Sequence, residues 1–190
     1  DKLSGTPYHL CIDHVAEGTS HKAIYDEMLR TRRVDGLILV ESEARDERIV
    51  KLQEDNFPFV LIGNPGDFSG ILSVDNDNVF AGELATRHLL EQGYRRIAML
   101  AGPRGVTVSE DRIGGYVAAA QDSEIPINVI HAGFGLESAY NHALEALSQP
   151  NRPDAFVVLD DYMAIGAVMA ARQLMVSIPD QLGIVSFNDT

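Results

Sequence analysis

Short apolar runs alternate along the chain with segments whose apolar side chains recur at helical spacing. Runs rich in β-branched residues are typical of buried strands, whereas apolar residues three and four apart are typical of an amphipathic helix. The pattern predicts eight strands, over 8–12, 36–40, 57–62, 71–74, 96–102, 129–134, 155–159 and 182–187. It predicts helices over 20–32, 45–55, 77–92, 109–122, 136–149 and 161–174.

Most of the predicted strands are apolar along their whole length, which is typical of a parallel sheet covered by helices on both faces. One sheet of eight strands is possible, but a polar stretch, VDNDN, starts at Val74, and a fresh strand–helix series follows it. We therefore expect an α/β fold of two Rossmann-like lobes with parallel sheets, residues 1–74 and 75–190. Ligands of such sheets bind beyond the carboxyl ends of the strands, so we expect the ligand in a cleft between the lobes.

The formal net charge of -13 argues against binding of nucleic acid by this chain, because an acidic surface repels phosphate backbones. No apolar run approaches the roughly 18 residues that a membrane helix needs. The lone cysteine, Cys11, fits a reducing compartment, and its apolar neighbours predict that it is buried. The chain starts without Met and ends directly after a strand-like run, so we expect it to be part of a longer protein.

Motifs of catalysis and of cofactor binding are missing from the sequence. It contains no phosphate-binding loop, dinucleotide fingerprint, HExxH pair or GxSxG turn. The six histidines are scattered, and His88 and His142 are expected on helix surfaces. Asp160 and Asp161 alone supply too few oxygen ligands for a metal ion. We therefore expect neither an enzyme nor a metal or cofactor site.

Polar and aromatic residues follow the ends of the predicted strands instead. Guanidinium and carboxylate groups bond paired hydroxyls, and an aromatic ring stacks on the apolar face of a sugar, so this combination suits a polyhydroxylated ligand. Taken singly, each residue is more often a loop or cap residue, and only their shared placement at the carboxyl ends of parallel strands favours ligand binding. The candidates are Gly63, Ser73, Arg112, Phe134, Asp160 and Asn188.

The adjacent acids Asp160 and Asp161 end the strand-like run FVVL and start a helical pattern. We expect Asp161 to cap the helix, since a carboxylate there accepts from free backbone N–H groups and suits the helix dipole. We expect Asp160, one residue earlier, to bind the ligand.

Five segments resemble the effector-binding core of the LacI/GalR family of bacterial transcription regulators. They are RRVDGLILV (32–40), FPFVLIGNP (57–65), SVDNDNVFAGELATRHLLEQGYRRIAMLAGP (73–103), RPDAFVVLDDYMAIGAV (152–168) and IPDQLGIVSFNDT (178–190). The block from VDN to GYRRIAMLAGP is the most specific of them. The resemblance extends through nearly the whole chain.

The resemblance implies two Rossmann-like lobes like those of periplasmic sugar-binding proteins, joined by three crossover strands. It implies that a DNA-binding helix-turn-helix, a hinge helix and the first strand and helix of the core precede Asp1, and that the last crossovers follow Thr190. It further implies a cytoplasmic homodimer whose sugar-like effector changes operator affinity, with operator DNA bound through the missing domain. Candidate dimer surfaces are helix 20–32, the segment after Val40 and one face of helix 161–174.

The resemblance also assigns roles to the candidate residues. Arg112 matches the family arginine that grips ligand hydroxyls, and Asp160 matches the Asn or Asp that faces the cleft. Phe134 falls where members often carry a stacking aromatic, and Asn188 falls at a ligand-binding Asp. The remaining two depart from better-known members: Gly63 replaces a common Asp, which removes a contact or makes room, and Ser73 lies at the first crossover, where some members place an aromatic.

Two alternatives remain open. A periplasmic sugar-binding protein would share the fold and the cleft chemistry, but it would carry a signal peptide and be monomeric. An enzyme on the same type of fold would turn its ligand over.

Overall fold

A computed structural model describes residues 4–12, 21–31 and 33–188. The chain divides into two units, the first made of Asp1–Leu37 and Asp46–Phe59 and the second of Ile38–Arg45 and Val60–Thr190. The predicted division after Val74 stays a prediction.

The first unit contains the helices α1 (His21–Thr31) and α2 (Glu47–Glu54). Helix α2 starts after Asp46, whose buried carboxylate accepts from the Arg48 N–H at 3.0 Å and pairs with the Arg48 guanidinium at 2.6 Å. This cap satisfies a free donor of the first turn. The helix buries Ile49 and Leu52.

A three-stranded sheet contains β1 (Leu37–Val40), β2 (Phe59–Ile62) and β3 (Ser73–Val74), in the order β1-β2-β3. Strand β3 pairs with β2 in parallel. Strands β1 and β2 start in the first unit and continue into the second.

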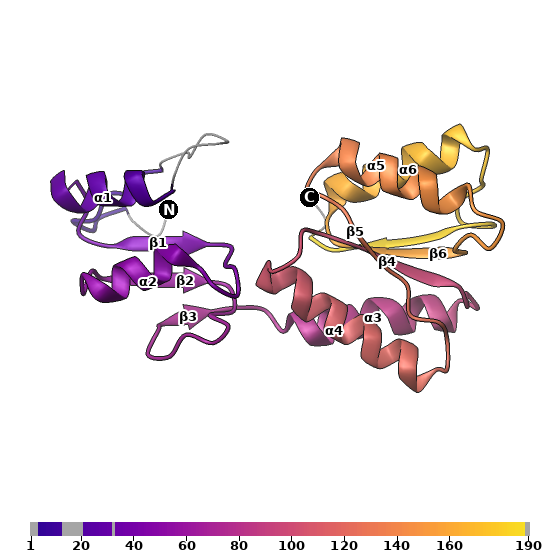
Figure 1. The fold of residues 1–190 in the computed structure, drawn as a ribbon, viewed down its shortest axis with the longest axis horizontal. Helices are drawn as coiled ribbons and strands as arrows, with labels where there is room; N and C mark the ends of the chain where they lie inside the picture. Colours follow the sequence, from indigo (N-terminus) through magenta and orange to yellow (C-terminus); the bar gives the residue numbers. More distant parts are fainter. Residues whose placement is uncertain (1–3, 13–20, 32, 189–190) are drawn as a thin grey trace. The chain divides into compact units, whose positions relative to one another are not determined.

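The second unit carries a four-stranded parallel sheet of the order β5-β4-β6-β7, with strands β4 (Ile97–Ala101), β5 (Val129–His131), β6 (Ala155–Val158) and β7 (Gly183–Ser186). Helices α3 (Asn78–Glu91) and α4 (Thr107–Asp122) cover one face. Helices α5 (Leu136–Leu147) and α6 (Asp161–Gln173) cover the other (Figure 1). Every residue of the central strands β4 and β6 is buried, as their unbroken apolar sequences predict.

Glycines let the helices of each pair approach closely. A Cβ atom on Gly82 would lie 2.2 Å from the Arg112 carbonyl oxygen, and one on Gly115 would lie 1.9 Å from that of Val79. Both distances are far below van der Waals contact, so α3 and α4 cross backbone to backbone here. On the other face, Gly166 of α6 approaches the Leu136 carbonyl in the same way.

The predicted α/β fold with parallel sheets is confirmed, and all six predicted helices form. The predicted strand 8–12 is wrong, because these residues are exposed and pair with no strand of the described chain. A short apolar run becomes a strand only where a neighbouring strand accepts its hydrogen bonds. Cys11 lies in this segment and is exposed, so its predicted burial is also wrong. No helix of the described residues is long and apolar enough to cross a membrane.

Candidate functional site

Four of the six candidate residues belong to the domain built on the four-stranded sheet. Phe134 follows β5, Asp160 follows β6 and Asn188 follows β7, so all three lie at the carboxyl edge of that sheet. Arg112 lies on α4, the helix that follows β4. This edge is where parallel α/β sheets bind their ligands.

Arg112 is buried, with 8% of its surface exposed, and it is held by three different elements. Its Nε donates to Oδ1 of Asn78 at 3.0 Å, and its Nη1 donates to the carbonyl oxygen of Leu159 at 2.7 Å. Its guanidinium carbon lies 4.2 Å from the ring centroid of Phe187, a cation–π contact. Arg112 therefore joins α4 to the start of α3 and to the ends of β6 and β7.

The charges of two acids, Asp75 and Asp160, act on Arg112 without a direct ion pair. Burial lowers the pKa of Arg112 from its usual value, and the charges of Asp75 and Asp160 oppose that shift. No carboxylate of the described residues lies within salt-bridge distance of the guanidinium. A guanidinium stays protonated in proteins, so Arg112 is a buried cation.

The two adjacent acids have other roles than predicted. Asp160, not Asp161, caps α6: its backbone is extended, and its Oδ1 accepts from the Met163 N–H at 2.7 Å. Asp161 is the first helical residue, and its carboxylate accepts from the Ser186 hydroxyl at 2.7 Å. The prediction that Asp161 is the cap is therefore wrong. The role of Asp160 in binding the effector stays a prediction. Its Oδ2 would bind the effector, because Oδ1 caps the helix.

Phe134 is 45% exposed, and its ring lies against Gly102, where an added Cβ would come within 3.3 Å of Cε1. The Phe134 ring is thus partly accessible to solvent. Asn188 is exposed and has a φ of 93°, a left-handed conformation that asparagine tolerates better than most residues. Its neighbour Phe187, which the sequence did not suggest, contacts Arg112.

Gly63 and Ser73 belong to the three-stranded sheet. Gly63 follows β2 with a φ of 138°, and its N–H donates to the Val74 carbonyl at 2.9 Å. A side chain here would be strained, and its Cβ would come within 3.3 Å of the Ser42 hydroxyl. The backbone conformation therefore favours glycine at this position. Ser73 is half-buried and pairs with Leu61 of β2. No hydrogen bond or ion pair joins either residue to Arg112 in the part of the chain that the structure describes.

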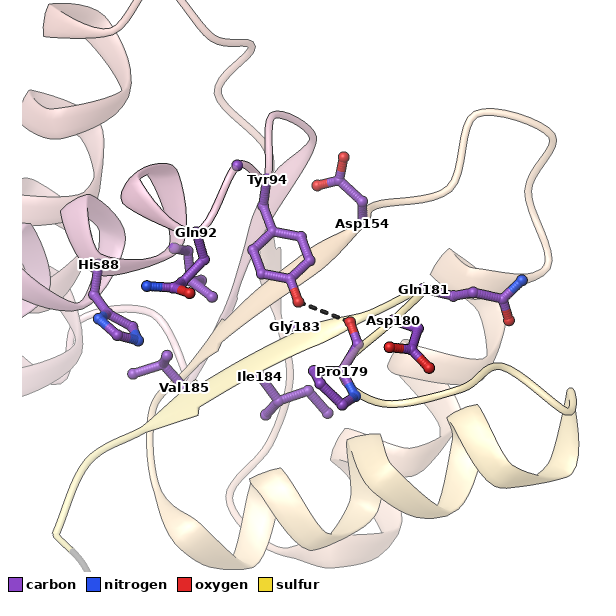
Figure 2. A pocket seen from close by; sticks show the side chains of 12 residues that line it. His88, Gln92, Tyr94, Asp154, Pro179, Asp180, Gln181, Gly183, Ile184 and Val185 are labelled. Atoms are coloured by element: carbon purple, nitrogen blue, oxygen red, sulfur yellow. Dashed lines mark hydrogen bonds between the residues drawn. The ribbon is translucent and has the colours of Figure 1, made fainter.

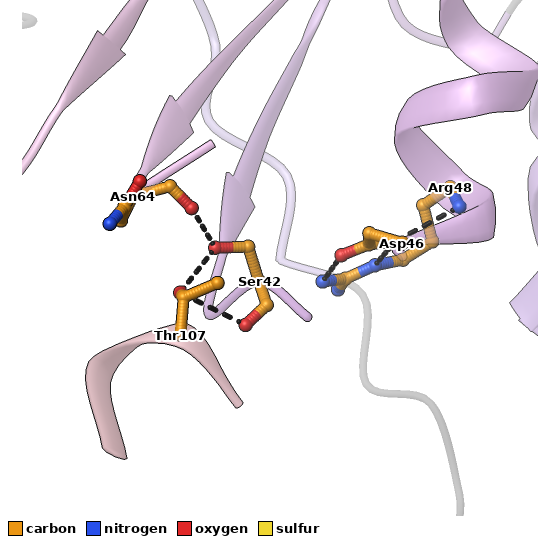
Figure 3. A network of polar contacts seen from close by, with 5 residues as sticks. All are labelled: Ser42, Asp46, Arg48, Asn64 and Thr107. Carbon is orange, nitrogen blue, oxygen red and sulfur yellow. Dashed lines mark hydrogen bonds and ion pairs between the residues drawn. The ribbon is translucent and has the colours of Figure 1, made fainter. Parts of the chain in front are cut away.

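A buried polar network links the loop after β1 to the start of α4 (Figure 3). The Ser42 hydroxyl donates to the Asn64 carbonyl at 2.6 Å and lies 2.8 Å from the Thr107 hydroxyl. The Thr107 N–H donates to the Ser42 carbonyl at 2.9 Å. The Asn64 amide also donates to the carboxylate of Asp111, the residue before Arg112, at 2.8 Å. The first two turns of α4 are therefore fixed by residues that follow β1 and β2.

An open hollow of about 660 Å³ lies elsewhere, beside β7 (Figure 2). Its lining includes Tyr94, Asp154 and Gly183, which precede or start strands, so it lies at the amino edge of the sheet. Two polar groups of the hollow have internal partners: the Tyr94 hydroxyl donates to the Pro179 carbonyl at 2.7 Å, and Asp154 accepts from the N–H of Arg96 at 2.9 Å. Because it lies at the opposite edge from Arg112, it is not the predicted ligand site.

Among the described residues, no group of three or more His, Cys, Asp or Glu side chains could hold a metal ion. His88 is exposed, as predicted. His142 is only half-buried, and its Nδ1 lies 2.8 Å from the Ser138 carbonyl oxygen of its own helix.

Residues 10–189 match the sequence profile of the periplasmic binding proteins and sugar binding domain of the LacI family. The chain belongs to this family. Among relatives, the HTH-type transcriptional repressor PurR of Photorhabdus laumondii is 32% identical over 186 residues, which cover 95% of this chain and 54% of the repressor. PurR of Escherichia coli O139:H28 is 27% identical over 187 residues, 96% of this chain and 55% of that protein. The chain thus spans about half the length of these repressors.

Solved structures of LacI-family regulators share the fold. A putative LacI transcriptional regulator from Bacillus cereus subsp. cytotoxis is 31% identical with a TM-score of 0.87, over 93% of this chain and 65% of the other. The transcriptional regulator CelR in complex with cellobiose is 27% identical with a TM-score of 0.79, over 88% of this chain and 53% of the other. The two-lobed periplasmic-binding-protein-like fold and the predicted family are confirmed.

Sequence reasoning missed the residues that hold Arg112. Asn78 lies 34 residues away, Leu159 contributes a backbone carbonyl that carries no side-chain signal, and Phe187 looked like the end of an apolar strand. The one available signal was the polar run VDNDN (74–78), which leads into α3. Its last residue, Asn78, is buried, with 4% of its surface exposed.

Proposed function

We propose that this chain is the effector-sensing part of a LacI-type transcription regulator. A small polyhydroxylated compound, a sugar or sugar derivative, binds at the carboxyl edge beside Arg112 and favours one conformation by its differential affinity. A separate DNA-binding domain then changes its operator affinity. The proposal includes a cytoplasmic location, because operator DNA is found there. It includes no enzymatic activity.

Arg112 carries this proposal. It is buried at the ligand-binding edge, its Nε and Nη1 are held by the protein, and no described residue bonds its Nη2. Asp160 supplies an acceptor and Phe134 an exposed ring at the same edge. Donor, acceptor and ring are the groups that a sugar requires. The structural relative CelR, solved as a complex with cellobiose, supports this class of effector.

The charges favour an uncharged effector. The charges of Asp75 and Asp160 both act on Arg112, so the one cation is accompanied by two acidic side chains and the formal charge of the three groups is negative. A sugar phosphate would add negative charge to a site that is already negative. A neutral sugar bonds the same donors and acceptors without that repulsion.

The test is a thermal-shift screen of neutral sugars, sugar phosphates, nucleosides and purines. A neutral sugar should raise the melting temperature, since a ligand at 100 times its dissociation constant stabilises by about 2.7 kcal/mol. Arg112→Ala should abolish that response, whereas Arg172→Ala, at an exposed arginine of α6, should keep it. A response that survives Arg112→Ala would disprove the proposed site, and a response confined to sugar phosphates would disprove the charge argument.

A homodimer is the second part of the proposal. Tyr162, Ile165 and Met169 recur along one face of α6 and are 68%, 49% and 44% exposed. An apolar stripe of this kind is typical of a surface that a second copy covers. The other predicted dimer surfaces, helix 20–32 and the segment after Val40, stay predictions.

Sedimentation equilibrium tests the α6 stripe. Ile165→Asp should shift the protein to monomer. Ile127→Asp is the matched control, because Ile127 is equally exposed, at 48%, but precedes β5 instead of lying on α6. A dimer that persists in Ile165→Asp, or one that both variants disrupt, would reject α6 as the interface.

A further inference from the structure

Asn78 and Arg112 face each other where α3 and α4 cross. Asn78 is the first residue of α3 and is almost fully buried, and its Oδ1 accepts from the Arg112 Nε at 3.0 Å. The helices are locked close together by Gly82 and Gly115. The asparagine therefore meets the arginine in a rigid part of the domain.

The Asn78 amide has one possible orientation. Its Nδ2 donates to Oδ1 of Asp75 at 3.0 Å and to the Asn76 carbonyl at 3.3 Å. A flipped amide would place its NH₂ donors against the Arg112 Nε, which is also a donor, and its oxygen against two acceptors. The surrounding groups thus fix the amide oxygen toward the guanidinium.

We propose that Asn78 is a positioning residue for the effector, acting through Arg112. The bond to Asn78 and the bond from Nη1 to Leu159 fix the plane of the guanidinium, and Phe187 packs against it. The direction of the remaining nitrogen, Nη2, is thereby set before a ligand arrives. A donor that is already ordered loses less conformational entropy on binding. This role rests on the proposed function only in taking Arg112 as an effector-binding residue.

The experiment observes the Arg112 side chain directly and needs no effector. Arginine Nε–H groups are recorded by ¹⁵N–¹H NMR, with the Arg112 signal assigned by its loss in Arg112→Lys. The wild-type protein should show a protected Arg112 Nε–H, and Asn78→Ala should lose it. Labelling of Arg112 by phenylglyoxal should become about tenfold faster in Asn78→Ala, since a hydrogen bond to a charged group is lost.

Thr86→Val is the matched control. Thr86 is buried on the same helix, and its hydroxyl donates to the Gly82 carbonyl at 2.8 Å, so the variant loses a buried hydrogen bond of α3 away from the guanidinium. It should keep the protected Arg112 signal. If Asn78→Ala also keeps it, or if Thr86→Val loses it equally, Asn78 has only a structural role and the proposal is wrong.

The wild-type protein supplies a second test in case Asn78→Ala does not fold. The Arg112 Nε–H should exchange with solvent at least about tenfold more slowly than that of Arg104, which is exposed. Equal exchange rates would overturn the proposal. These measurements report on Arg112 alone, so a failed effector screen would reject the proposed function without deciding this inference.

Discussion

The Ser186 hydroxyl on β7 donates a hydrogen bond to the carboxylate of Asp161, 2.7 Å away at the start of α6. The preceding acid, Asp160, caps the same helix through the Met163 N–H. One acid thus ties α6 to the neighbouring strand, while the other orders its first turn. The start of α6 is fixed at the sheet edge where we place the effector.

Replacing Asp160 separates its cap from its charge. Asp160→Ala should lower the free energy of unfolding by about 1 kcal/mol, because the Met163 N–H loses its acceptor. Asp160→Asn should lower the free energy of unfolding much less, since asparagine is an equally good N-cap. Urea denaturation measures both. If the asparagine variant is destabilised as strongly as the alanine variant, the carboxylate charge and not the cap is the source of stability.

The bond between Asp161 and Ser186 predicts energetic coupling. Asp161→Ala and Ser186→Ala should each cost about 1 kcal/mol, and the double variant should cost less than the sum by about 0.5 kcal/mol or more. Ser148→Ala replaces Ser186→Ala in the control pair. Ser148 is the C-cap of α5, and its hydroxyl donates to the Leu144 carbonyl of that helix. Additive effects in the Asp161–Ser186 pair would contradict the bond.

The order of helices and strands could be predicted because each element carries its own apolar pattern. The unbroken run around Met99 is fully buried in β4, and α5 buries Ala139, Ala143 and Leu147 at helical spacing. Such patterns depend only on residues a few positions apart in the sequence. The strand predicted over 8–12 fails because pairing depends on a neighbour that its own residues do not specify.

The candidate site was less predictable, because its contacts join distant residues. Asp160 and Asp161 are the same residue type and equally good caps, so the pattern could not choose between them. The choice depends on the backbone of Asp160, which is extended at φ -150° and ψ 172°. In the same way, Arg112 was recognised as a ligand candidate, but its partners Asn78 and Leu159 come from elements that only the fold brings to it.

The contact between Ser42 and Thr107 predicts a second coupled pair. The Ser42 hydroxyl donates to the Asn64 carbonyl, and the Thr107 hydroxyl lies 2.8 Å from the Ser42 hydroxyl and also donates to the Ser42 carbonyl at 3.1 Å. Ser42→Ala should cost roughly 1–3 kcal/mol, because it leaves buried polar groups unsatisfied. Thr107→Val should cost less in the Ser42→Ala background than in the wild-type protein, as judged by urea denaturation, because one of the two partners of the Thr107 hydroxyl is already gone. Thr31→Val, at an exposed hydroxyl of α1, should be additive with Ser42→Ala.

Neighbouring glycines of α4 predict opposite effects of one added methyl group. A Cβ on Gly115 would lie 1.9 Å from the Val79 carbonyl oxygen and 2.6 Å from the Glu83 nitrogen, whereas one on Gly114 meets nothing within 4 Å. Gly115→Ala should therefore lower the free energy of unfolding by about 3 kcal/mol through overpacking. Gly114→Ala should raise it by roughly 0.5–1 kcal/mol, because alanine favours the helix.

Thermal and urea unfolding of the two glycine variants measure the difference, with Gly114→Ala as the control for helix propensity. Gly115→Ala must also push α4 away from α3, which moves Arg112 relative to Asn78. The variant should therefore lose the protected Arg112 Nε–H signal, while Gly114→Ala keeps it. Equal stabilisation by both substitutions would mean that α3 and α4 do not cross at Gly115, and the proposed positioning of Arg112 would lose its rigid support.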